Sequence, residues 1–251
     1  MFLRLACLLL LVHSSLALAE AAPAQQKPLL FMTADVWPWG YINPEGEPVG
    51  LISQFAEQLA STAELPLHNR VLPHQRLLAD FQRGQADFTV LFENPYLDDL
   101  ADSVGVVLNS DILLVSNHSF PGDLNLAALA DKTVGYIRGT YYGEAFEHDQ
   151  KIIKIPVYNL DQAIHMLLIG RLDALISSDV VFHHSLLAQQ LSADHFHFQT
   201  LTRGHAAHLY LSRKASHPEL LPRISAALEQ MRATGELKHI FHSSLRQPSA
   251  D

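Results

Sequence analysis

The chain has 251 residues, of which 48% are hydrophobic. This is enough to bury one large or two small cores and argues against disorder or a fibrous repeat. The formal net charge is −9, which disfavours nucleic acid and anionic lipid as partners. Cys7 is the one cysteine, so neither a disulfide framework nor a thiolate zinc site is expected.

The first nineteen residues have the pattern of a secretory signal peptide. Arg4 precedes an apolar run over residues 5–12, and Ala17-Leu18-Ala19 is typical of a cleavage site. The apolar run is too short to span a bilayer. We therefore predict a signal peptide over 1–19, a flexible leader over 20–28, and export of the protein to the periplasm.

Helix-like and strand-like segments alternate from residue 29 onward. A turn-rich hairpin over 43–50 precedes an amphipathic helix over 51–60, because apolar residues recur there at helical spacing. A second helix over 77–81 is stopped by Gly84. Apolar runs over 88–92 and 112–115 are typical of buried strands.

The same alternation begins again after Pro121-Gly122. Asp123 and Asp161 are placed to cap helices, and Pro218 to lie in the first turn of the terminal helix. The expected elements are a strand over 133–137, a helix over 161–168, a strand over 174–176, an edge strand over 196–200, a short segment over 209–211 and a helix over 218–231. This order predicts an α/β architecture with mostly parallel strands and two cores.

Several motifs, in order along the mature chain, resemble a known family, the bacterial extracellular solute-binding proteins of family 3. This family includes the periplasmic amino-acid receptors of ABC transporters. The motifs are Glu47-Pro48-Val49-Gly50-Leu51, the segments over 81–87, 134–142 and 168–176, and the closing segments over 211–220 and 235–237.

The resemblance implies the type II fold of periplasmic binding proteins, with two lobes joined by two crossing strands. Lobe one would comprise 29–116 plus 207–251, and lobe two 117–206. Such proteins bind a ligand between the lobes and close by a hinge motion that a membrane partner can read. The resemblance thus implies a monomer that needs no cofactor and works with an ABC permease or a membrane sensor.

The segment Arg138-Gly139-Thr140-Tyr141 is the candidate site in lobe two. A strand that ends in Gly-Thr before a helix presents backbone N–H groups and a hydroxyl where the helix dipole favours an anion. A carboxylate would suit this position. The alternative is that the segment only caps a helix on a tight turn.

The segment over 35–41 is the candidate site in lobe one. Trp37, Trp39 and Tyr41 follow the first strand on a turn, where the family sets an aromatic wall against its ligand. The alternative is that these rings only cover the edge of a core, since aromatic side chains bury large areas wherever they lie.

Two departures from the family pattern make an ordinary α-amino acid ligand doubtful. Where amino-acid receptors carry Thr-x-Glu-Arg, this chain has residues 93–99 without arginine, so the carboxylate clamp is missing from its usual place. The family's amine-binding Asp aligns with Ser178, one residue before Asp179.

Other side chains are candidates to replace the missing pair. Arg76, in a Pro-x-x-Arg pattern, and Arg138 could hold a carboxylate from other directions. Glu93 or Asp179 could meet a donor on the ligand. The alternative for Arg76 is a solvated surface side chain.

Three other functions are alternatives for this sequence. The fifteen histidines do not show the short, rigid spacing of a zinc site. A periplasmic dehydratase of the prephenate or arogenate type has the same fold, and Glu93, Glu144 or Asp179 could serve as its acid. An orphan sensory or protein-contact module is the third alternative. We predict a binding protein, not an enzyme, for a small polar or anionic organic solute that is amino-acid-like or a carboxylate.

Overall fold

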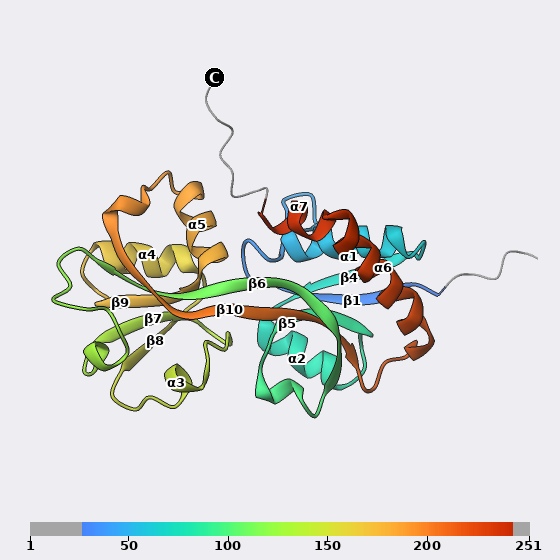
Figure 1. Ribbon diagram of the computed structural model, residues 1–251, viewed down its shortest axis with the longest axis horizontal. Helices are drawn as coiled ribbons and strands as arrows, with labels where there is room; N and C mark the ends of the chain where they lie inside the picture. The colour runs from blue at the N-terminus through green and yellow to red at the C-terminus, as the bar shows by residue number, and fades with distance from the viewer. Residues whose placement is uncertain (1–26, 243–251) are drawn as a thin grey trace, which may run out of the picture.

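The computed structural model describes residues 27–242 (Figure 1). The predicted signal peptide over 1–19 and most of the leader over 20–28 lie outside the described residues. An eight-stranded mixed sheet runs through the molecule, in the order β4-β1-β5-β10-β6-β9-β7-β8. Its strands are β1 (Leu29–Ala34), β4 (Leu67–Leu72), β5 (Phe88–Phe92), β6 (Ala101–Asn117), β7 (Thr133–Ile137), β8 (Ile153–Val157), β9 (Ala174–Ser178) and β10 (Phe196–Ser212).

The two halves of the sheet form two lobes. In lobe one, β1 pairs in parallel with β4 and β5, and in lobe two, β7 pairs in parallel with β8 and β9. The strands β6 and β10 pair antiparallel with each other and run across both lobes (Figure 1). The predicted α/β class is confirmed, and the parallel pairs are confined to the two ends of the sheet.

The two crossing strands are longer than the sequence predicts. Each has 17 residues, whereas the apolar pattern indicated only 112–115, 196–200 and 209–211. The prediction of an edge strand over 196–200 is confirmed for that part of β10, because residues 196–200 pair only with β6 and the pairing of β10 with β5 is confined to 207–211. The middle of β10 passes between the lobes and is exposed. Only β6 pairs with it there, so its sequence is polar.

Helices cover both faces of each lobe (Figure 1). On one face lie α1 (Leu51–Thr62), α6 (Leu221–Thr234) and α7 (Glu236–His242) of lobe one, with α4 (Leu160–Leu168) and α5 (Asp179–Ala188) of lobe two. On the other face lie α2 (His74–Gln82) and the short α3 (Glu144–Glu147). A small hairpin of β2 (Tyr41–Ile42) and β3 (Pro48–Val49) precedes α1. No helix in the described part of the chain is long and apolar enough to cross a membrane.

Three expected helix starts differ by a few residues. Asn159, not Asp161, caps α4 and accepts a hydrogen bond from the backbone N–H of Gln162. Asn125, not Asp123, accepts from the N–H of Ala128. A cap oxygen must lie two or three residues before the N–H it accepts from, and the sequence offers several polar residues at each start. Pro218 begins a single 3₁₀ turn, and α6 follows from Leu221.

Apolar clusters fill the space between the sheet and the helices. The largest lies beneath α1, α6 and α7 and continues beneath α4 and α5, with Phe55, Phe241 and Phe182 fully buried. On the opposite face each lobe has a smaller cluster of its own, around Phe81 and around Phe146. The lobes therefore have separate cores on the face that carries α2 and α3.

Candidate ligand-binding cleft

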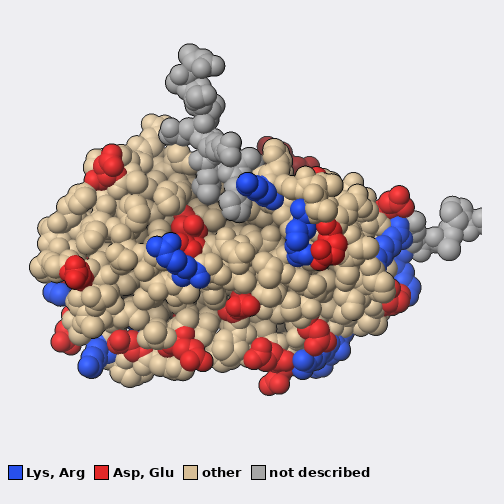
Figure 2. Space-filling view, in the orientation of Figure 1, with Lys and Arg blue, Asp and Glu red and all other residues tan. Residues whose placement is uncertain are grey.

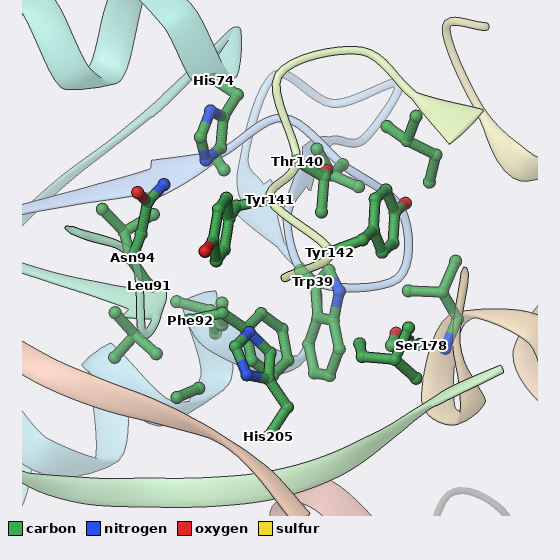
Figure 3. Close-up of a pocket in the computed structure, with 18 of the residues that line it drawn as sticks. Trp39, His74, Leu91, Phe92, Asn94, Thr140, Tyr141, Tyr142, Ser178 and His205 are labelled. Carbon is green, nitrogen blue, oxygen red and sulfur yellow. Dashed lines mark hydrogen bonds between the residues drawn. The ribbon is translucent and has the colours of Figure 1, made fainter. Parts of the chain in front are cut away.

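A cavity of about 70 Å³ lies between the lobes and is lined by both (Figure 3). The ends of β1 and β5 reach it from lobe one, and the ends of β7 and β9 from lobe two. In a sheet of this kind the carboxyl ends of parallel strands face a common crevice, where ligands bind. The crossing strands close one side with Leu108, Ile112, His205 and Ala207.

Aromatic rings form the wall of the cavity on the side of lobe one. Trp39 meets Phe92 edge to face, with 5.7 Å between ring centroids. The ring of His205 stacks on Phe92 at 5.2 Å, and the two planes differ by 6°. Trp39 is supported from behind by Phe241 of α7 at 6.5 Å. This packing holds the rings in fixed orientations.

Two histidines that line the cavity, His74 and His205, each have a buried nitrogen atom. The Nδ1 atom of His74 and the Nε2 atom of His205 are buried and have no hydrogen-bond partner among the described residues. Burial lowers the pKa of His74. Burial also lowers the pKa of His205, against the opposing charge of Glu93. Both imidazoles are therefore neutral at neutral pH, and each carries one donor and one acceptor nitrogen.

The turn after β7 supplies the polar groups of lobe two. The side chains of Thr140 and Tyr141 line the cavity, with Ser178 at the end of β9 (Figure 3). Some backbone groups of this turn are already engaged: the N–H of Thr140 donates to the carbonyl of Ile137, and the N–H of Tyr142 donates to Glu147. The polar groups that line the cavity here are therefore the hydroxyl groups of Thr140, Tyr141 and Ser178.

Gly139 lets this turn approach lobe one closely. Its φ angle is +86°, and a Cβ atom there would lie 3.3 Å from the Nδ1 atom of His74. A side chain at this position would be strained at this φ angle and would press against the imidazole, which would have to shift slightly.

The cavity lining is uncharged. No Asp, Glu, Lys or Arg within residues 27–242 lines it, and its other lining residues are mostly apolar. The same part of the chain contains no group of three or more His, Cys, Asp or Glu that could hold a metal ion.

The predicted site residues fall into three groups. Trp39, Thr140 and Tyr141 line the cavity. Trp37, Tyr41 and Arg138 line a more open hollow of about 450 Å³, which adjoins the cavity because both include Val36, His74 and Ile137. The remaining predicted residues, Arg76, Glu93 and Asp179, line neither space, and Gly139 lies in the turn described above.

Hydrogen bonds and ion pairs occupy the side chains of this last group. The Nε atom of Arg76 contacts Asp80 at 2.9 Å. Glu93 accepts from the Nε2 atom of His208 at 2.9 Å. Asp179 accepts from the backbone N–H of Asp111 at 3.1 Å and from Ser110. The side chains of Arg76, Glu93 and Asp179 thus stabilise the fold of their own lobes and of the crossing strands.

The residue-level predictions missed several lining side chains, above all His74, Phe92, Asn94 and His205. Asn94 had a signal, since it follows the buried strand over 88–92 within the segment where the family's arginine is expected. His74 lies in the same Pro-x-x-Arg pattern as Arg76. His205 had no local signal, because only the pairing of β10 with β5 and β6 brings it against Phe92.

Comparison with known proteins identifies the class to which this cleft belongs. The model of the bacterial extracellular solute-binding proteins, family 3, matches residues 30–246. The chain belongs to this family. No curated protein matches the sequence significantly.

Solved structures share the fold over nearly their whole length. An ancestral arginine-binding protein bound to arginine is 17% identical, with a TM-score of 0.72, and the match covers 87% of this chain and 98% of that one. A His/Glu/Gln/Arg/opine family-binding protein from Silicibacter pomeroyi, in complex with lysine, is 16% identical, with a TM-score of 0.70 and coverage of 88% and 99%. A histidine kinase sensor domain with similarity to periplasmic binding proteins is also 16% identical, with a TM-score of 0.70 and coverage of 86% and 95%. The type II fold of periplasmic binding proteins is confirmed.

Proposed function

We propose that this protein reversibly captures a small organic solute between its two lobes, in the periplasm, for uptake through an ABC permease or for sensing. The observation that supports this most directly is the cavity to which both lobes contribute side chains. Trp39 and Phe92 come from one lobe, and Thr140 and Tyr141 from the other.

Closure of the lobes is the proposed mechanism. A ligand that touches both lobes contacts more protein in the closed form than in the open form, so it shifts the population toward closure. The lobes we propose are 29–116 with 207–251, and 117–206. Two crossing strands are suited to act as the hinge, since few residues need to change conformation.

We propose that the solute is polar, and that any carboxylate it carries faces the open hollow. Arg138 is the cation there, 5.3 Å above the ring of Tyr158. Glu93 and Asp179 are engaged in hydrogen bonds away from the cavity, which favours binding without chemistry over a dehydratase.

A thermal-shift screen of residues 20–251 tests the proposed function. The compounds are amino acids, dicarboxylates, polyamines, aromatic acids and neutral heterocycles. A ligand about 100-fold above its Kd stabilises the folded state by about 2.7 kcal/mol, which corresponds to several degrees in a protein of this size.

Two variants locate the binding. Thr140→Ala should clearly reduce the shift, whereas Thr234→Ala, at an exposed threonine of α6, should preserve it. A well-folded protein that responds to none of the compounds would exclude solute capture within these classes.

A further inference from the structure

We propose that the inner cavity selects an uncharged, planar, nitrogen-containing aromatic ring. This inference rests on the proposed function and specifies its ligand class. It follows from three properties of the described lining: its electrostatics, its aromatic surfaces and its unpartnered hydrogen-bonding atoms.

The electrostatics disfavour the free amino-acid group. An α-ammonium and an α-carboxylate each need an opposite charge or several hydrogen bonds when they leave water. The nearest candidates are engaged elsewhere: Asp179 with β6, Glu93 with His208, and Arg76 with Asp80. A charged group in the inner cavity would therefore be buried without a counter-ion.

The aromatic surfaces favour a flat ligand. The stacked pair of Phe92 and His205 and the ring of Trp39 stand on one side of the cavity, and Tyr141 reaches in from the other lobe (Figure 3). Aromatic rings attract one another in offset-stacked and edge-to-face arrangements. A planar ring gains these contacts from both lobes when they close.

The unpartnered atoms favour a ring that both donates and accepts hydrogen bonds. The Nδ1 atom of His74 and the Nε2 atom of His205 are buried without partners, and buried polar atoms of this kind destabilise a fold unless a ligand or water satisfies them. Thr140 adds a hydroxyl group. Asn94 and Ser178 already accept hydrogen bonds from nearby backbone N–H groups, so they add neutral donors. Amide-bearing rings and nucleobase-type rings carry the matching groups.

The volume limits the ligand to a single small ring. A cavity needs about 10–15 Å³ on this measure for each water molecule, so 70 Å³ offers on the order of five to seven positions of that size. A six-membered ring fills such a space. A substituent would extend into the adjoining hollow beside Arg138.

Binding of matched probes tests the proposal by thermal shift and by quenching of tryptophan fluorescence. The neutral rings are nicotinamide, uracil and cytosine. The controls are 1-methylnicotinamide, which carries a permanent charge, cyclohexanecarboxamide, which is neutral but not planar, and arginine, glutamate and glutamine. We expect at least one neutral ring to bind at least tenfold more tightly than every control.

Two variants assign the effect to the cavity. His205→Phe keeps a ring on Phe92 but removes the nitrogen, and Thr140→Val removes a hydroxyl at nearly constant volume. Each should weaken binding of the selected ring about tenfold. His197→Phe, on the same strand but outside the cavity lining, should leave it unchanged.

The other outcomes are distinguishable. Binding of a free amino acid, or of 1-methylnicotinamide, as tightly as of any neutral ring would overturn this inference and leave solute capture supported. Absence of binding by all probes and by the compounds of the wider screen would overturn both. Equal weakening by His197→Phe would overturn the assignment to the inner cavity.

Discussion

At the scale of single residues, several charged side chains stabilise the fold, whereas the cavity between the lobes is lined by neutral ones. The carboxylate of Asp80 is fully buried and contacts Arg70, Arg76 and Arg83. Asp87 accepts from the backbone N–H of His217 in the loop before α6. On the face shown in Figure 2, acidic and basic side chains are interspersed. The polar groups that line the cavity are hydroxyls, an amide and imidazoles.

Acid is expected to destabilise the protein through His74 and His205. Burial lowers the pKa of both, so the unfolded chain, in which a histidine has a pKa of about 6.5, binds more protons than the folded one. Their contribution to stability is complete above about pH 6.5 and declines as the pH falls through that value.

Thermal unfolding at pH 7.5 and pH 5.5 checks this expectation. The melting temperature of the protein should fall on acidification. The melting temperature of a double variant, His74→Phe with His205→Phe, should fall by less. Glu93 faces His205 and opposes the effect, while His184, whose pKa burial also lowers, adds to it. An unchanged pH dependence in the double variant would contradict the assignment to these two imidazoles.

At the scale of elements, the segment between β1 and α1 fixes the aromatic wall. Its backbone is tightly folded against the start of α1, and the N–H groups of Leu51 and Ile52 donate to the carbonyls of Pro38 and Trp39. Gly50 has a φ angle of +107°, and a Cβ atom there would lie 2.8 Å from both of these carbonyl oxygens. The turn that carries Trp39 therefore depends on a residue without a side chain.

Gly50→Ala is expected to destabilise the protein by about 1–3 kcal/mol, because the backbone conformation is strained for alanine and the turn must also move. Gly46→Ala is the matched control. Gly46 also has a positive φ angle, +86°, but has no atom within 4 Å of the added Cβ. Urea unfolding should show a clearly larger loss in the free energy of unfolding for Gly50→Ala than for Gly46→Ala. Equal losses would show that the close approach of the added Cβ to the two carbonyl oxygens does not matter.

At the scale of the whole molecule, side chains of the two lobes contact each other, and we propose that these contacts favour the closed form. Trp37 of lobe one meets His184 of α5 edge to face, with 5.8 Å between centroids. Gly139 of lobe two lies against His74 of lobe one. These contacts lie beside the cavity, and the residues that make them are not part of the apolar cores of the lobes.

Trp37→Ala is expected to weaken ligand binding and leave the fold intact. An aromatic pair contributes about 0.5–1.5 kcal/mol beyond its buried area, which corresponds to roughly a two- to twelvefold higher Kd for the compound selected by the screen. Trp37→Phe, which keeps a ring, should retain most of the affinity. Small-angle scattering at saturating ligand should still show closure of the variant; an unchanged Kd for Trp37→Ala would show that this contact does not favour the closed form.

The sequence by itself determined the α/β class, the family and most of the helices and inner strands. These follow from local periodicity and from short motifs, such as the apolar spacing of α1 and the Gly-Thr turn after β7. It also indicated Trp39, Thr140 and Tyr141, because they lie directly after strands whose carboxyl ends face the crevice.

Only the tertiary structure decided which side chains share the cleft and which charges are engaged elsewhere. His205 meets Phe92 through the antiparallel pairing of a 17-residue strand, a contact between segments more than a hundred positions apart. Asp179 looks free in the sequence, yet Ser110 and the backbone of β6 engage it. The partner of Arg76 is different, because Asp80 lies four residues further along the same helix. Periodicity reports which face of an element is buried, whereas the partner of a polar side chain depends on distances between elements that no local pattern encodes.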